Sequence, residues 1–377
     1  MRKRKWFAIA LTAVMAVQML AGCGASGSGE QAAGSDAAAT EAPAEDKTDA
    51  AATEAPADTG TEDGKVLKIG FSWSHKNDSL FYSFDEALTK AMDATCKDHG
   101  YDKVEWIHVV AEDDADKQAS DISDLLTQKC DVIVAYAFDN VAIASSAKEC
   151  KDAGVPFVLY DRNMAPEAEP KADLFVGLDT TNQAYLAGKE FFQQMKDAGV
   201  EPKDIISIMG ATNDTNALNR EKGFTQAAKE FGYEIKQEVP SDWDAEKALT
   251  GFSAAFQANP ETNCVLIASD FIVTAVQSVL ESNDAWHPNG EDGHVWICSQ
   301  DGFPTGIKFM QEGYMDCSGM YDVDAMGKNF AAAIYDIIEG SYDGPAEVYS
   351  DPMVVKADEV DSLELWGKNY MEEAAGN

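Results

Sequence analysis

Short apolar runs and amphipathic stretches alternate along the chain from residue 66 onward. Ten runs have the length and apolar content of buried strands. They lie at 66–71, 104–110, 131–138, 155–160, 174–178, 205–210, 234–239, 264–268, 295–298 and 315–321. Helical patterns fill the gaps, as where Phe84, Leu88 and Met92 recur at i, i+4 and i+8. This alternation is typical of parallel sheets covered by helices on both faces, so it predicts an α/β fold.

The same series of elements starts twice. The strand VLKIGF at 66–71 leads through a polar loop and a helix to DHGY, which ends at Tyr101. The strand IISIMG at 205–210 leads in the same way to EFGY, which ends at Tyr233. Residues 65–377 are numerous enough for two cores. We therefore expect two doubly wound parallel-sheet lobes, with a ligand site where the carboxyl ends of their strands meet.

The first residues have the pattern of an export signal. Basic residues 2–5 precede an apolar stretch at 6–20, which is short for a permanent membrane span. The sequence Leu-Ala-Gly-Cys that ends at Cys23 resembles the bacterial lipobox, which implies a lipoprotein signal peptide at 1–22 and lipidation of Cys23. The alternative is a cysteine placed there by chance. The expected location is extracytoplasmic, with the membrane reached only through this lipid anchor.

Residues 24–64 contain no aromatic residue and no Ile, Leu, Val or Met, and they repeat TEAPA at 40–44 and 53–57. Such a segment cannot bury enough apolar surface to offset the entropy of ordering. We expect 23–64 to be a disordered tether that begins at the lipidated cysteine.

Charge and cysteine content narrow the class of protein further. The formal net charge is −37, which argues against binding to nucleic acid or to anionic lipid surfaces. Six cysteines follow Cys23, none with CxxC spacing, and three lie in apolar runs. Buried free thiols are expected, although a disulfide stays open for an exported protein.

No catalytic or metal motif is present. GxSxG, HExxH and P-loop patterns are absent, residues 65–377 contain no GxGxxG, and the five histidines are scattered. The acidic run 113–116 lacks the glycine turn and terminal Glu of an EF-hand loop, so it is interpreted as a solvated helix entrance. Sequons at 77–79 and 213–215 are interpreted as accidental. We therefore expect that the protein is not an enzyme and that it binds neither a cofactor nor a metal.

Polar and aromatic residues follow directly after several of the expected strands. Asp161 and Arg162 end one strand, and Arg220 lies one turn into a helix after another. Trp243 follows a third strand in a polar loop, and Asp301 ends a fourth. Because strand ends of one sheet share an edge, these side chains are expected to converge on one cleft.

Six short segments of the chain together resemble the motifs of a known protein family. They are VPFVLYDR at 155–162, VGLD at 176–179, NxxxREKGF at 216–224, DWD at 242–244, ASD at 268–270 and QDG at 300–302. Taken in this order, residues 66–350 resemble the type I periplasmic binding proteins for sugars, the ribose- and galactose-binding group. The resemblance implies a monosaccharide ligand, an aldohexose or an aldopentose. The calcium loop of the galactose-binding branch is not reproduced at 194–204.

The resemblance also implies ligand-binding residues. Asp161 and Arg162 would bind sugar hydroxyls from the first lobe, and Arg220 with Asn216 would do so from the second. The other residues implied are Asn77, Asp78, Phe81, Trp243, Ser269, Asp301 and Tyr321.

Several positions have open alternatives. Trp243 would cover one face of the sugar ring and Phe81 the other, with Trp73 and Tyr82 as rivals of Phe81. Asp322 is the alternative to Tyr321 at a hinge position. Asp270 is interpreted as a helix N-cap rather than a ligand contact.

The expected organisation follows from the resemblance. One lobe would comprise 65–177 plus 321–350 and the other 178–320 plus 351–377, linked by a three-crossing hinge. A monomer would deliver the sugar to the membrane permease of an ABC transporter. Two alternatives stay open: a sugar-sensing subunit for a chemoreceptor or sensor kinase, and a ligand of another kind, such as a nucleoside, an inositol or an autoinducer-type furanose.

Overall fold

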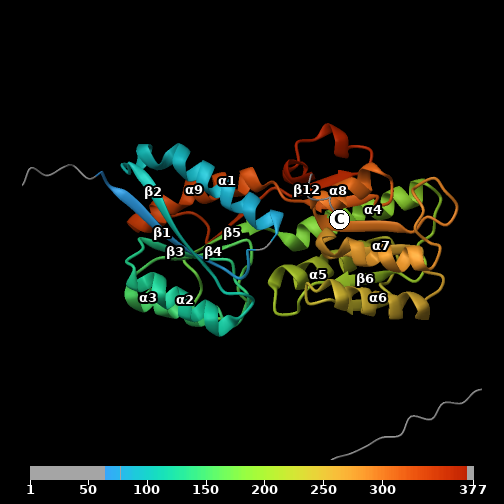
Figure 1. Cartoon of the computed structure of the whole chain (residues 1–377), viewed down its shortest axis with the longest axis horizontal. Coiled ribbons are helices and arrows are strands. Elements are labelled where there is room, and N and C mark those ends of the chain that lie inside the picture. The colour runs from blue at the N-terminus through green and yellow to red at the C-terminus, as the bar shows by residue number, and fades with distance from the viewer. Residues whose placement is uncertain (1–63, 77, 372–377) are drawn as a thin grey trace, which may run out of the picture. The chain divides into compact units, whose positions relative to one another are not determined.

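The computed structural model describes residues 64–76 and 78–371. The expectations for the signal peptide, for Cys23, for the tether up to residue 63 and for Asn77 lie outside the described residues. The described part contains two six-stranded sheets with helices on both faces (Figure 1). This confirms the predicted α/β fold with two sheets.

The first sheet has the strand order β11-β5-β4-β3-β1-β2, and all its pairings are parallel. Its strands are β1 (Val66–Trp73), β2 (Lys103–Val110), β3 (Val132–Ala135), β4 (Phe157–Tyr160), β5 (Leu174–Leu178) and β11 (Glu347–Ser350). Helices α1 and α9 pack on one face of it and α2 and α3 on the other (Figure 1). Their bounds are α1 (Ser79–Thr95), α2 (Ala115–Thr127), α3 (Ala144–Ala153) and α9 (Val323–Glu339). We call this unit the first lobe.

The second sheet repeats this order as β12-β10-β9-β8-β6-β7. Its strands are β6 (Ile206–Met209), β7 (Gln237–Pro240), β8 (Cys264–Ile267), β9 (Trp296–Asp301), β10 (Cys317–Met320) and β12 (Met353–Lys356). Helices α4 and α5 cover one face and α6, α7 and α8 the other. Their bounds are α4 (Thr180–Asp197), α5 (Thr215–Glu230), α6 (Ala245–Ala258), α7 (Val273–Ser282) and α8 (Pro304–Gln311). This unit is the second lobe.

Two strands were not predicted. β11 and β12 are four-residue edge strands with mostly half-exposed or exposed side chains, so they lack the apolar run that marks a buried strand. β12 also pairs antiparallel with β10, which makes the second sheet mixed. The ten predicted strands are all present, with ends shifted by at most three residues.

The chain passes three times between the lobes. β5 belongs to the first sheet and the following α4 packs against α5 in the second lobe. β10 belongs to the second sheet and the following α9 packs against α1 in the first lobe. The third passage lies between Ser350 and Met353, which end β11 and begin β12.

Aspartates cap several helices at the point where the chain passes from a strand-end loop into the helix. In six helices the capping carboxylate accepts a hydrogen bond from a backbone N–H of the first turn, which stabilises the helix start and favours a negative charge there. The caps are Asp78, Asp114, Asp179, Asp214, Asp244 and Asp322, of α1, α2, α4, α5, α6 and α9. Part of the acidity of these loops is therefore structural.

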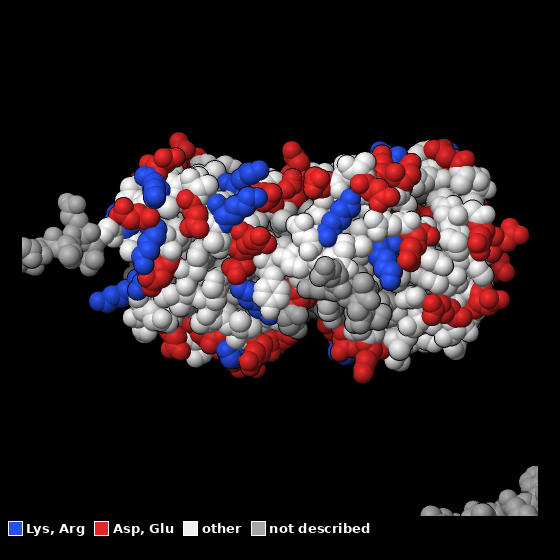
Figure 2. Space-filling model, turned by 45° about the horizontal axis from the view of Figure 1, so that its top comes forward, with Lys and Arg blue, Asp and Glu red and all other residues white. Residues whose placement is uncertain are grey.

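The six cysteines of the described chain are all buried and none forms a disulfide, as expected. Acidic side chains are spread over both lobes on the face shown in Figure 2, with basic ones between them. Within residues 64–76 and 78–371, no helix combines the length and apolar character needed to span a bilayer.

Candidate functional site

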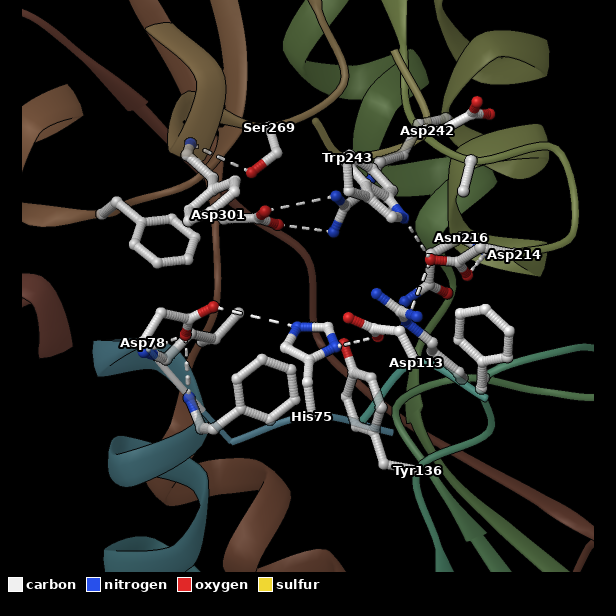
Figure 3. A pocket seen from close by; sticks show the side chains of 18 of the residues that line it. His75, Asp78, Asp113, Tyr136, Asp214, Asn216, Asp242, Trp243, Ser269 and Asp301 are labelled. Atoms are coloured by element: carbon white, nitrogen blue, oxygen red, sulfur yellow. Dashed lines mark hydrogen bonds and ion pairs between the residues drawn. The ribbon is translucent and has the colours of Figure 1, made fainter. Parts of the chain in front are cut away.

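A cavity of about 410 Å³ lies between the two lobes, at the carboxyl ends of their strands (Figure 3). The first lobe contributes His75, Asp78, Leu80, Phe81, Asp113, Tyr136, Phe138 and Arg162. The second contributes Ala211, Asn213, Asp214, Asn216, Arg220, Asp242, Trp243, Ser269, Phe271, Asp301 and Phe303, and Tyr321 follows β10 at a lobe passage. The cavity thus has the place that the strand-end residues indicated.

Most of the residues expected at the site meet here. Those that line the cavity are Asp78, Phe81, Arg162, Asn216, Arg220, Trp243, Ser269, Asp301 and Tyr321. Asp161 does not form part of the lining. It is fully buried, and its Oδ2 accepts a hydrogen bond of 3.0 Å from Nδ2 of Asn216, which does line the cavity. The structure therefore places Asp161 behind Asn216.

Arg220 and Asp301 form a buried, bidentate ion pair within the second lobe. Nη2 of Arg220 lies 2.5 Å from Oδ1 of Asp301, and Nη1 lies 3.3 Å from Oδ2. The guanidinium also donates to the Ala268 carbonyl at 2.8 Å and to the Tyr321 hydroxyl at 2.9 Å. Burial alone would lower the pKa of Arg220, but Asp301, Tyr321, Asp161 and Asp214 together outweigh it and raise that pKa. Arg220 is therefore a fixed positive charge in the cavity wall.

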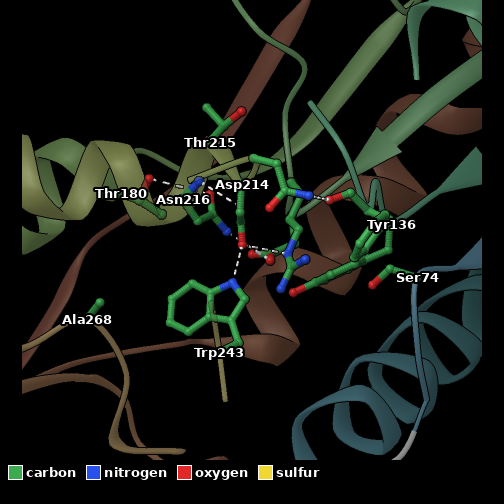
Figure 4. A network of polar contacts seen from close by, with 12 residues as sticks. Ser74, Tyr136, Thr180, Asp214, Thr215, Asn216, Trp243 and Ala268 are labelled. Carbon is green, nitrogen blue, oxygen red and sulfur yellow. Dashed lines mark hydrogen bonds and ion pairs between the residues drawn. The ribbon is translucent and has the colours of Figure 1, made fainter. Parts of the chain in front are cut away.

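Arg162 and Asp214 form a second buried ion pair, which joins the two lobes (Figure 4). Nε of Arg162 lies 2.9 Å from Oδ2 of Asp214, as an ion pair rather than an aligned hydrogen bond. The guanidinium carbon lies 4.6 Å from the centre of the Tyr136 ring, within cation–π range. Arg162 is thus held by a carboxylate of the second lobe and by an aromatic ring of the first lobe, to which it belongs.

The Trp243 indole is held in a fixed orientation. Its Nε1–H donates to Oδ2 of Asp214 at 2.9 Å, and its backbone is left-handed with φ 58°. The ring lies against the end of β6, where a Cβ on Gly210 would come within 2.1 Å of it. Glycine at 210 is therefore required for the indole to reach the cavity. Trp243 therefore presents a rigid aromatic ring at the cavity wall.

Of the three rings considered for the opposite face, only Phe81 lines the cavity. It packs edge-on against Tyr136, with ring centres 4.9 Å apart. Trp73 is fully buried in the core of the first lobe and Tyr82 is 51% exposed; neither lines the cavity. Tyr321 lines the cavity, while its alternative Asp322 caps α9.

Asp78 sits at the start of α1, where its Oδ1 accepts from the backbone N–H of Leu80 at 3.0 Å. Burial raises the pKa of Asp78 to about 6, against the lowering effect of His75. Burial likewise raises the pKa of Asp161 to about 6, although Arg220 opposes it. Burial also raises the pKa of Asp301, so Asp78, Asp161 and Asp301 all gain a proton more readily than exposed aspartates.

The sequence interpretation missed several residues of the site. Asp113 was assigned to a solvated helix entrance, but only its neighbour Asp114 caps α2. Asp113 itself lines the cavity and contacts Nδ1 of His75 at 2.9 Å. Asp214 was dismissed as part of a chance sequon, although its position between β6 and Arg220 was a signal that could have identified it.

The interpretation of Asp270 as an N-cap was wrong. Ser269 is the cap, since its Oγ accepts from the N–H of Phe271 at 3.1 Å. The Asp270 carboxylate instead accepts from the N–H groups of Gly302 at 3.1 Å and Phe303 at 3.0 Å. It therefore positions the loop that follows Asp301.

Comparison with known proteins identifies a family whose model matches most of this chain. The model of the family described as "Periplasmic binding protein domain" matches residues 69–341. The ribose import binding protein RbsB of Bacillus subtilis is 24% identical over 276 residues, or 73% of this chain and 83% of its own length. The D-ribose/D-allose-binding protein of Pseudomonas aeruginosa is 23% identical over 240 residues, or 62% and 72%.

Solved structures agree in fold. A Mycobacterium smegmatis protein in complex with β-D-fucofuranose has a TM-score of 0.69 and 19% identity, covering 82% of this chain and 97% of its own. An ABC transporter periplasmic solute binding protein from Actinobacillus succinogenes with bound D-allose has a TM-score of 0.66 and 21% identity, covering 78% and 99%.

Proposed function

Because this chain belongs to the periplasmic binding protein family, we propose that it is the extracytoplasmic solute-binding protein of an ABC-type sugar importer. It would bind a monosaccharide, an aldohexose or aldopentose, between its lobes, reversibly and without chemistry. The observation that carries this is the composition of the cavity: two buried arginine–aspartate pairs beside the Trp243 and Phe81 rings. The names of relatives that bind ribose and allose support it.

This composition matches the chemistry of a sugar. Each hydroxyl both donates and accepts, while Arg only donates and an ionised Asp only accepts, so the two together can satisfy it. The apolar C–H faces of the ring need flat partners, which Trp243 and Phe81 supply from opposite lobes. A hydroxyl left unpaired on closure costs about 1–3 kcal/mol, so the site discriminates between epimers.

Six side chains of the cavity would form hydrogen bonds with the sugar hydroxyls. They are Arg162, Asn216, Arg220 and Asp301, with Asp78 and Tyr321 beside them. Asp161 acts through Asn216 in it, because its Oδ2 accepts from Asn216 and its side chain lies behind the lining. Ser269 contributes a short hydroxyl at the end of β8.

The N-terminal motifs complete the proposed role. Signal cleavage before Cys23 and lipidation of that residue would keep a monomeric capture domain near its permease, at the end of the 23–64 tether. Cys23→Ser is therefore expected to release a protein that still binds sugar.

A thermal-shift panel of monosaccharides tests the function. Ligand at 100 times its dissociation constant stabilises the folded state by about 2.7 kcal/mol, which raises the melting temperature by several degrees. D-ribose, D-allose, L-arabinose and D-galactose are the first probes, with uridine and myo-inositol as probes of other classes. A shift with a sugar is expected. Shifts only with uridine or myo-inositol would contradict the monosaccharide claim, and turnover of the sugar by mass spectrometry would contradict reversible binding.

Two variants connect that shift to the cavity. Trp243→Ala removes the aromatic face and is expected to abolish the sugar-induced shift while the ligand-free protein still melts cooperatively. Tyr82→Ala is the matched control, because Tyr82 is an exposed aromatic residue that does not line the cavity. Equal loss of the shift in both variants would show that the ring of Trp243 has no specific role.

A further inference from the structure

Four consecutive residues of the second lobe each contact the first lobe. They form the segment Asn213–Asn216, at the turn that leads into α5. Its contacts are Asn140 N to Asn213 O (3.0 Å), Asn213 Nδ2 to Phe138 O (3.2 Å), Asp214 to Arg162 (2.9 Å), Thr215 Oγ1 to Asn163 O (2.6 Å) and Asn216 Nδ2 to Asp161 Oδ2 (3.0 Å).

We propose that the segment Asn213–Asn216 is a clasp that closes the lobes in the absence of ligand, and that Asp214 is its central positioning residue. Each of its contacts joins protein atoms on both sides, and three of them use backbone carbonyls as acceptors. None of them therefore uses a ligand atom as a bridge. The proposal goes beyond sugar binding and can be measured without any sugar.

The clasp is built on rigid parts of both lobes. On the second lobe, Oδ1 of Asp214 caps α5 by accepting from the backbone N–H of Asn216 at 2.9 Å. On the first lobe, Asp161, Arg162 and Asn163 follow directly after β4. Because both partners are fixed before they meet, little conformational freedom is lost when the contacts form.

Asp214 couples lobe closure to the proposed sugar contacts. Its carboxylate meets Arg162 across the cleft and also accepts from the Trp243 indole. The side chain is 1% exposed, so it has left water almost completely in this arrangement. Affinity for a ligand falls with the fraction of molecules that are competent to bind it, so the closing equilibrium set by the clasp would also set the apparent dissociation constant.

The test measures closure of the ligand-free protein. Donor and acceptor dyes are placed at Lys148→Cys in α3 and Lys229→Cys in α5, both exposed, while the six described native cysteines are buried. Single-molecule energy transfer then gives the ratio of closed to open molecules, with small-angle scattering of the unlabelled protein as a second measurement. In the ligand-free wild type, at least about half of the molecules are expected to be closed.

Asp214→Asn keeps one side-chain oxygen, which can still cap α5, but puts an amide NH2 in place of the oxygen that faces Arg162 and accepts from the indole. It is expected to lower the closed-to-open ratio about tenfold. Thr215→Val removes only the hydroxyl donor and is expected to lower it about threefold. Asp244→Asn is the matched control, because Asp244 caps α6 in the same way but is exposed and contacts Lys247 of its own helix.

A ligand-free wild type that is almost entirely open would overturn the clasp, and so would a ratio in Asp214→Asn equal to that in Asp244→Asn. Neither result depends on whether a sugar binds, so a failed sugar panel and a failed clasp are distinguishable. Melting of the ligand-free variants separates the roles further. A merely structural Asp214 would lower the melting temperature and leave the ratio unchanged.

Discussion

The two arginine–aspartate pairs of the cleft are equally well buried but differ in what they join. Arg220–Asp301 lies within the second lobe, with side chains 3% and 6% exposed. Arg162–Asp214 joins one lobe to the other, with side chains 9% and 1% exposed. A static view of burial would give them the same energetic weight.

The two pairs differ in how a charge left without its partner can be hydrated. If one partner of Arg220–Asp301 is removed, the remaining charge stays inside the lobe and can be hydrated only by unfolding part of it. If one partner of Arg162–Asp214 is removed, the hinge can open and water reaches the other. A buried charge therefore costs stability only where no low-energy motion exposes it.

The largest expected effect is from Arg220→Met. The substitution keeps much of the side-chain volume but leaves Asp301 buried without its cation, near the buried Asp270 carboxyl that follows β8. A loss of about 3–5 kcal/mol in the free energy of unfolding is expected at pH 7. Urea denaturation followed by circular dichroism measures it.

Lys222→Met is its control, since Lys222 lies on the same helix and is exposed. That variant is expected to change the free energy of unfolding by less than about 0.5 kcal/mol. A similar small change in Arg220→Met would show that the pair within the lobe is as easily hydrated as the pair between lobes.

Glu221, next to Arg220, is a buried carboxyl with a hydroxyl partner rather than a cation. Ser207 donates to it at 2.5 Å, and burial raises its pKa from 4.5 to about 7. Between those two pH values the folded protein binds more protons at this group than the unfolded chain, so the contribution of Glu221 to stability falls as pH rises. Above pH 7 the full cost of burying the charge remains.

Glu221→Gln is therefore expected to stabilise the protein by about 1–3 kcal/mol at pH 8 and to have little effect at pH 4.5. Thermal melts at the two pH values measure the difference. Glu167→Gln, at an exposed position, is expected to show no such pH-dependent gain. An equal effect of Glu221→Gln at both pH values would mean that the pKa of this carboxyl is the same in the folded and the unfolded chain.

The sequence was sufficient for features that depend on local pattern. The buried strands followed from apolar runs, and Arg220 and Asp301 followed from their places just after strands, because parallel strands bring their carboxyl ends together. The edge strands β11 and β12 were missed because half-exposed strands carry no apolar run.

Features that depend on the meeting of the lobes were not predictable. The partners Arg162 and Asp214 are 52 residues apart, and their contact exists only when the lobes approach. Asp161 and Arg162 look equivalent as neighbours in the chain, yet one lies behind Asn216 and the other lines the cavity. The backbone at Asp161 is left-handed, with φ 63°, and no periodicity of the sequence indicates such a turn at the end of a strand.

The smallest effect on stability is expected from Arg162→Met, and it tests the comparison most directly. Opening of the hinge would hydrate Asp214, so the free energy of unfolding should fall by no more than about 1 kcal/mol, including the lost contact with the Tyr136 ring. The ligand-free protein should instead become more open in small-angle scattering, as in Asp214→Asn. If Arg162→Met destabilises as much as Arg220→Met, the lobes do not separate to hydrate the remaining carboxylate, and the distinction between the two pairs is lost.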